Sequence, residues 1–255
     1  MTTDPRETFS RSADRYLDST DHRTGPDLMV ISETARALQP RLTVDIASGA
    51  GHALKAAVPF SAFGIAVDLT AQMLKVAREN LERAGLTGAG FVQARAEDLP
   101  VPHESAGLVT CRIACHHFSS ITDFLSEVRR ILAPHGSFIM VDSIVPSNSE
   151  AGDFLNRLER LRDPSHVRSL NMEQWLEFFR KIKLPVSSVS TFERVHSFTE
   201  WSRRVLQDED SLRKLEGEFK NAPDHIKEEF RIEQDPDGSV ISYTDKKVII
   251  VAEKR

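Results

Sequence analysis

The sequence predicts an α/β protein built on a doubly wound, mostly parallel sheet of seven strands, with helical insertions that cap it. Short apolar segments typical of buried strands alternate with helical repeats over the first 146 residues. The first of these strands runs into a small-residue turn, where Gly49 and Gly51 let the backbone approach a ligand. The next strand ends at Asp68, where a dinucleotide-type fold hydrogen-bonds ribose hydroxyls. Together the turn and the carboxylate indicate a nucleoside-binding fold.

The core elements follow one another in a regular order. A helix over residues 26–38 precedes the first strand, and further helices begin near His52 and after Thr70. Another carries Phe124, Val128, Ile131 and Leu132 in phase and ends before Gly136. We expect core strands at residues 42–46, 63–67, 90–94, 107–113 and 137–141. In such sheets ligands bind at the carboxyl ends of the strands. These ends are Asp45 to Gly51, Asp68, Arg95 to Asp98, Arg112 to His117, and Asp142.

The alternation stops after Pro146. Residues 150–182 and 198–229 read as helical, whereas residues 186–195 and 247–252 read as strands. Asn171 and Gln174 fit a capping box before an apolar face that we interpret as part of a lid. We therefore expect one domain over residues 1–255, with an N-terminal cover (1–40), a cofactor-binding core (41–146) and cap insertions (147–185 and 197–240).

Composition excludes several functional classes. A formal net charge of -5 disfavours general nucleic-acid binding, which depends on clustered Lys and Arg. The polar N-terminus does not resemble a signal peptide, and no run of about 18 apolar residues is present. Two cysteines make no disulfide framework. We expect a cytoplasmic protein without membrane insertion, either a monomer or a homodimer.

Two cofactor classes share this fold, and one position separates them. Dinucleotide-binding turns of the dehydrogenase type carry a third Gly or Ala where this chain has Leu54. From about Thr43 to Pro146 the chain instead resembles class I S-adenosylmethionine-dependent methyltransferases, especially the ubiquinone and menaquinone C-methyltransferases. The matching segments, in order, are residues 45–51 (DIASGAG), 67–74 (VDLTAQML), 96–100 (AEDLP), 111–118 (CRIACHHF) and 132–136 (LAPHG).

The resemblance implies S-adenosyl-L-methionine as the cofactor and assigns it a set of contacts. Asp68 would accept the ribose hydroxyls, with Leu69 and Met73 beside the nucleoside. Gly49 and Gly51 would line the methionine part. The remaining implied cofactor residues are Asp45, Ala47, Ala96, Glu97, Arg112 and, less specifically, Tyr16.

Two positions depart from the family pattern. Ala47 stands where the family has its first turn glycine, which is compatible with the turn if the local φ is negative. Arg95 replaces a common aspartate and removes one possible adenine acceptor, so that adenine recognition would fall to backbone groups.

The candidate catalytic residues are His116, His117 and Asp142, all near expected strand ends. A neutral histidine suits an acceptor that must lose a proton before methylation. A packed structural role is as good an interpretation for each histidine. Cys111 and Cys115 with these histidines also suggest zinc, but adjacent histidines rarely face one metal and Cys111 lies within a strand, so we expect no metal.

These observations favour an S-adenosylmethionine-dependent methyltransferase acting on a small-molecule acceptor. A non-catalytic S-adenosylmethionine-binding scaffold or sensor is the alternative. A nicotinamide-dependent oxidoreductase is a further alternative that Leu54 disfavours.

Overall fold

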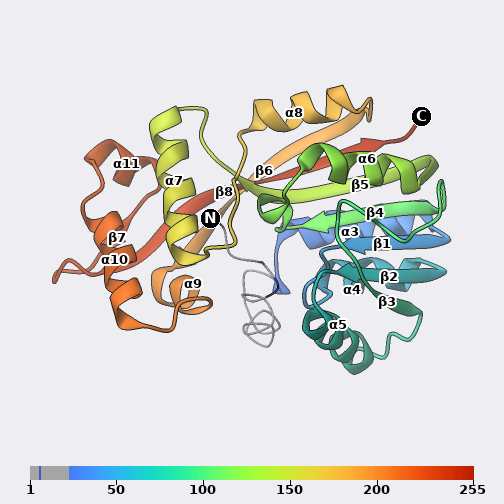
Figure 1. Ribbon diagram of the computed structural model, residues 1–255, viewed down its shortest axis with the longest axis horizontal. Helices are drawn as coiled ribbons and strands as arrows, with labels where there is room; N and C mark the ends of the chain where they lie inside the picture. The colour runs from blue at the N-terminus through green and yellow to red at the C-terminus, as the bar shows by residue number, and fades with distance from the viewer. Residues whose placement is uncertain (1–5, 7–22) are drawn as a thin grey trace.

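The computed structural model describes Arg6 and residues 23–255, so that Tyr16 lies outside the described residues. Within them an eight-stranded sheet has the order β3-β2-β1-β4-β5-β8-β6, with β7 pairing at the side of β8 (Figure 1). The strands are β1 Leu42–Ile46, β2 Phe63–Asp68, β3 Ala89–Gln93, β4 Ala106–Arg112, β5 Leu132–Ile144, β6 Val186–Ser197, β7 Glu233–Gln234 and β8 Val240–Glu253. The first five are parallel and β8 is antiparallel to both neighbours. The predicted fold class is confirmed.

The strand order places the ligand-binding edge. From β1 the chain moves outward to β2 and β3, then returns to β4 on the other side of β1 and continues to β5. The carboxyl ends of β1 and β4 therefore flank the point where the winding direction reverses, which is where open α/β sheets bind ligands.

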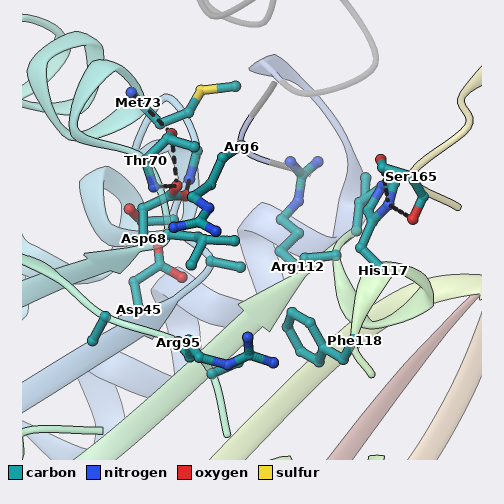
Figure 2. A pocket seen from close by; sticks show the side chains of 18 of the residues that line it. Arg6, Asp45, Asp68, Thr70, Met73, Arg95, Arg112, His117, Phe118 and Ser165 are labelled. Atoms are coloured by element: carbon teal, nitrogen blue, oxygen red, sulfur yellow. Dashed lines mark hydrogen bonds between the residues drawn. The ribbon is translucent and has the colours of Figure 1, made fainter. Parts of the chain in front are cut away.

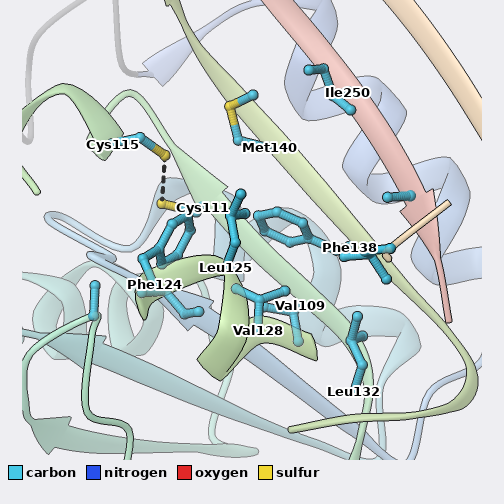
Figure 3. Packing of buried hydrophobic residues seen from close by; sticks show 14 of the residues in the cluster. Val109, Cys111, Cys115, Phe124, Leu125, Val128, Leu132, Phe138, Met140 and Ile250 are labelled. Atoms are coloured by element: carbon cyan, nitrogen blue, oxygen red, sulfur yellow. Dashed lines mark hydrogen bonds between the residues drawn. The ribbon is translucent and has the colours of Figure 1, made fainter. Parts of the chain in front are cut away.

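Helices cover both faces of the sheet. Their bounds are α3 Pro26–Leu38, α4 His52–Ala57, α5 Ala71–Arg83, α6 Ile121–Ile131, α7 Ser149–Arg162, α8 Met172–Lys181, α9 Phe198–Arg203, α10 Glu209–Lys220 and α11 Asp224–Glu229, with 3-10 turns η1 Val58–Phe60 and η2 Cys115–His117. Alternate side chains of β5 point to opposite faces of the sheet. Phe138 packs with α6 and α8, whereas Ile139 packs with α3 and α4. Figure 3 shows Phe124 and Val128 of α6 against Phe138.

The helix α8 corrects one expectation. Its apolar face was expected to belong to a lid, but Trp175 and Phe179 are buried with Phe138 in the cluster beneath α6. The Asn171 and Gln174 capping box at its start is confirmed. The apolar stripe was correctly identified, but a stripe does not specify which surface it covers.

A second apolar cluster forms the cap at one end of the sheet (Figure 1). It joins α7, α9, α10 and α11 around residues such as Leu158, Trp201 and Phe219, together with Tyr243 from the first half of β8. The second half of β8 belongs to the sheet cluster through Val248 and Ile250. One strand therefore connects the two cores. Among the described residues, no helix combines the length and apolarity needed to span a membrane.

Candidate active site

A cavity of about 510 Å³ opens at the carboxyl ends of β1, β2 and β4. In Figure 2, Asp45 and Asp68 lie on one side of it, His117 and Ser165 on the other, and Arg112 between them. Of the residues that sequence analysis assigned to the cofactor, those that line the cavity are Asp45, Ala47, Gly49, Asp68, Leu69, Met73, Ala96, Glu97 and Arg112.

Asp68 connects the β1 turn to the end of β2. Its Oδ2 accepts a hydrogen bond from the Gly49 N–H at 2.9 Å, and its Oδ1 accepts from the Thr70 N–H at 2.9 Å and the Thr70 hydroxyl at 3.1 Å. Burial raises the pKa of this carboxyl group above its usual value. Thr70 in turn caps α5 by accepting from the Met73 N–H. A carboxylate thus lines the cavity, held from both flanking segments.

The two turn glycines have different tasks. Gly49 has φ +51°, and a Cβ built there would meet no atom within 4 Å. Gly51, at φ +77°, is absent from the cavity lining, and its Cβ would lie 3.1 Å from Ala77 and Leu81 of α5. The structure thus places Gly51 against α5 and not in the cavity lining, and its contact with the cofactor stays a prediction. Gly51 permits α4 and α5 to pack closely.

Ala47 does not meet the condition under which a side chain would fit the turn without strain, because its φ is +52° rather than negative. The left-handed conformation costs a residue with a Cβ about 1–2 kcal/mol. Asp45, two residues earlier in β1, is almost fully buried and accepts from the Leu54 N–H and the Thr110 hydroxyl. Burial raises the pKa of Asp45 to about 7. These bonds hold the turn in a conformation that Ala47 alone would avoid.

The loop after β3 closes another side of the cavity. Glu97 accepts from both the N–H and the hydroxyl of Ser119, at 3.0 and 2.8 Å, and Arg95 donates to the same hydroxyl at 3.1 Å. The Glu97 carboxylate is therefore already engaged by Ser119. Arg112, on the opposite side, forms a buried ion pair with Asp27 at the start of α3.

Two of the three catalytic candidates form a buried pair away from the larger cavity. The His116 Nδ1 lies 2.6 Å from Asp142 Oδ1, and the His116 N–H donates to Asp142 Oδ2. Burial lowers the pKa of His116, but the adjacent carboxylate outweighs it and the pKa lies above its usual value. Neither residue lines the larger cavity, so that their prediction as residues facing this cleft is wrong. Asp142 holds the imidazole and the η2 backbone in place.

His117 is the candidate that lines the larger cavity. Its Nδ1 lies 3.2 Å from the Ser165 carbonyl oxygen, which can only accept, so Nδ1 carries the hydrogen. Burial and neighbouring His116 lower the pKa of His117 to about 4. The ring is therefore neutral at pH 7 and keeps a lone pair on Nε2, which lies 3.9 Å from Asp163 Oδ2. A proton taken up there would be stabilised by that carboxylate.

The cysteines and histidines do not converge. Cys111 and Cys115 are buried with their sulfurs 3.6 Å apart, while His116 and His117 bind Asp142 and Ser165. Within the described part of the chain, no three His, Cys, Asp or Glu side chains are arranged to hold a metal ion.

Several lining residues were not assigned to the cofactor site from the sequence. They include Arg6, Ser48, Thr70, Ile113, Phe118, Ser119, Ser165 and Val167. The signal for Thr70 was its place directly before a predicted helix. Arg6 lies in none of the motifs described above, so nothing in the sequence was a reason to place it at the cavity.

A doubly wound sheet with a glycine turn and a buried strand-end carboxylate at its winding reversal defines a nucleoside-binding α/β protein. Comparison with known proteins specifies the family. A methyltransferase domain family matches residues 44–140. The uncharacterised methyltransferase YcgJ of Bacillus subtilis is 32% identical over 247 residues, covering 97% of this chain and 98% of the relative.

Two further comparisons agree. The crystal structure of a protein from Bacillus halodurans C-125 described as a methyltransferase has a TM-score of 0.86 and 32% identity, covering 90% of this chain and 99% of that one. The ubiquinone/menaquinone biosynthesis C-methyltransferase UbiE of Pseudoalteromonas translucida is 35% identical over 91 residues, covering 34% of this chain and 36% of the relative. The chain belongs to the class I S-adenosylmethionine-dependent methyltransferases and is an enzyme of that family.

Proposed function

We propose that this enzyme transfers a methyl group from S-adenosylmethionine, bound in the larger cavity, to a small-molecule acceptor. The observation that carries the proposal is the Asp68 carboxylate, held at the carboxyl end of β2 within hydrogen-bond reach of the β1 turn. The cavity volume of about 510 Å³ falls within the range of small-molecule sites. The open space at Gly49 gives the cofactor a backbone approach that a side chain would fill.

In this arrangement each side of the cavity has its own task. Asp68 would accept the ribose hydroxyls, while Gly49 and Ala47 would border the methionine part. When bound, S-adenosylmethionine supplies an electrophilic methyl group. The chain's contribution is to align the acceptor with that methyl at roughly 3–3.5 Å and to exclude water.

His117 would lie on the acceptor side. Its neutral ring, with Nδ1–H donated to Ser165, holds Nε2 ready to accept a proton from an acceptor that must ionise. The Ser165 hydroxyl also donates a hydrogen bond to Asp163 at 2.6 Å, and this bond fixes the segment that carries Asp163 and Ser165. The division into an N-terminal cover, a cofactor-binding core and a cap is part of the same proposal, except that α8 packs on the sheet and not in the cap.

Calorimetric titration with S-adenosylmethionine and S-adenosylhomocysteine tests the cofactor site. We expect micromolar binding, which corresponds to about 8 kcal/mol. Asp68→Ala should weaken it at least about 100-fold, because two charge-assisted hydrogen bonds of about 1.5–3 kcal/mol each are lost. The matched control is Asp98→Ala, an exposed carboxylate in the loop after β3.

Equal affinity in the wild-type protein and Asp68→Ala would overturn the ribose assignment. Because Asp68 also binds Gly49 and Thr70, each variant is first shown to unfold cooperatively. Nicotinamide cofactors serve as the negative control.

A further inference from the structure

A second, smaller cavity lies next to the larger one, on the cap side of His117. We call it the basic cavity, because its lining includes Arg162, Arg194, Arg204 and Lys247 but one acid, Glu159. Ile113 and His117 line both cavities, so the two adjoin at these residues. Its volume of about 50 Å³ holds a few waters or one small functional group rather than a whole substrate.

The charged groups of the basic cavity are fixed by the surrounding structure. Lys247 is buried and donates to Asp245 at 2.7 Å and to the Ser143 hydroxyl at 2.6 Å. Arg162, also buried, donates to Glu159 at 2.7 Å. Asp142 lies behind the lining, bound to His116, and Asp245 is shared between Lys247 and His196. Although Lys247 and Arg162 are each paired with a carboxylate, the lining as a whole has more basic than acidic side chains, and this excess favours an oxyanion.

His166 adds a second, independent requirement. Its Nε2 lies 2.9 Å from Asn156 Oδ1, which also accepts from the Ser169 N–H, while Asn156 Nδ2 donates to two carbonyl groups. The Asn156 orientation is thus determined, and Nε2 must carry the hydrogen. Nδ1 is then a bare acceptor, and it is buried without a hydrogen-bond partner in the described structure. Because His166 lines the basic cavity, an O–H or N–H of a ligand bound there would supply the missing donor.

The neutral state of His166 agrees with that geometry. Burial and the nearby His116 lower the pKa of His166 to about 3. At pH 7 the ring therefore cannot serve as a cation for the ligand's charge. The arginine and lysine side chains supply the charge, and His166 supplies the lone pair.

We propose that the basic cavity holds the anionic end of the methyl acceptor, a carboxylate next to a hydroxyl or amino group that donates to His166. The inference rests on the proposed function, because it takes the larger cavity as the methyl-transfer site. The rest of the acceptor would pass Ile113 and His117 into that cavity. The substrate class is accordingly a small hydroxy- or amino-carboxylate.

Histidine NMR of the full chain tests this without knowledge of the acceptor. Three fragments serve as probes: glycolate carries both groups, acetate lacks the hydroxyl, and glycolamide lacks the charge. At constant ionic strength, we expect glycolate to shift the His166 Nδ1 resonance saturably, with a midpoint on the order of 10 mM. Acetate should bind several-fold more weakly, and glycolamide should leave the resonance unchanged. Equal effects of all three, or no effect of glycolate, would overturn the proposal.

Adjacent arginines supply matched variants. Arg204 lines the basic cavity, whereas Arg203 is exposed and pairs with Glu209. Arg204→Gln should weaken glycolate binding about tenfold, and Arg203→Gln should leave it within twofold. Equal losses would show general anion attraction and contradict the site. His166→Phe should abolish the preference for glycolate over acetate, and its spectrum also assigns the resonance.

The titrations are run with and without S-adenosylhomocysteine, which separates the two proposals. If S-adenosylhomocysteine binds but glycolate does not, the acceptor inference fails and the proposed function stands. If S-adenosylhomocysteine does not bind, the proposed cofactor site fails, and with it the assignment of the glycolate site to a methyl acceptor.

Discussion

At the scale of single residues, the site depends on side chains whose neighbours fix their protonation state. His116 and His117 are adjacent in the sequence, yet the pKa of one is raised by Asp142 and that of the other is lowered to about 4. Sequence reasoning identified both histidines but could not separate them. The difference arises because Asp142 and Ser165 come from distant segments, and only the fold determines which ring each one meets.

His166 leads to a prediction about stability in acid. Its pKa is about 3 in the folded chain and near 6.5 when unfolded, so the unfolded state takes up the proton first as pH falls. The free energy of unfolding should therefore decrease below pH 6.5, by up to about 1.4 kcal/mol per pH unit from this residue. In urea denaturation between pH 7 and 5, the free energy of unfolding should change less per pH unit in His166→Gln than in the wild-type protein.

The control for that measurement is His225→Gln, because the His225 side chain is 56% exposed. A reduced slope that His225→Gln reproduced would not be specific to the buried site. His117, whose pKa is also lowered, makes the free energy of unfolding fall with pH in the same way, whereas His116, whose pKa is raised, has the opposite effect. Both histidines remain in the variant, so their contributions cancel in the comparison. Identical slopes for the wild type and His166→Gln would contradict the buried, neutral state.

At the scale of elements, the turn between β1 and α4 has two roles. Gly49 lines the cavity, and Gly51 lets the turn pack against α5. Sequence spacing correctly placed Gly49 and Asp68 at the cavity. It assigned Gly51 to the same surface, because a glycine required by a ligand and one required by a neighbouring helix look alike in a sequence. The positive φ of Ala47 was equally hidden, since Asp45 and its partners impose it.

Alanine at each glycine should separate the two tasks. Both substitutions introduce a Cβ at positive φ, costing about 1–2 kcal/mol before a partial gain from the stiffer unfolded chain. Gly51→Ala should lose more stability, because its Cβ lies 3.1 Å from α5 side chains. Gly49→Ala should instead lose S-adenosylhomocysteine affinity by tenfold or more, because its methyl group enters the cavity. Urea denaturation and calorimetry measure the two effects, and a similar loss of affinity in both variants would contradict the assignment.

At the scale of the whole molecule, the cap cluster and the cluster beneath α6 are joined by one long strand, β8. The alternation of strands and helices was sufficient to predict the parallel sheet and its binding edge. The basic cavity was not predictable, because its lining comes from segments far apart in the chain, from Ile113 to Lys247. No local pattern marks residues that only the cap brings together.

The two tryptophans report on the two cores separately, since Trp175 lies in the sheet cluster and Trp201 in the cap cluster. In Trp175→Phe, the remaining Trp201 reports on the cap cluster. In Trp201→Phe, the remaining Trp175 reports on the sheet cluster. Within each variant, we expect the fluorescence and far-ultraviolet circular dichroism transitions in urea to coincide, because β8 contributes side chains to both clusters. A fluorescence transition that precedes the other signal in the cap probe would show that the cap unfolds first and would contradict this coupling.

The central place of β8 also affects the order in which the fold can assemble during synthesis. β8 pairs with β5 on one side and β6 on the other, although both precede it in the chain. Until residues 240–253 leave the ribosome, β5 and β6 each present an unpaired backbone edge, which is a template for misassociation. The cofactor-binding half of the sheet, β1 to β5, is complete earlier. A nascent chain would therefore assemble its nucleoside site well before it gains the cavity proposed to select the acceptor.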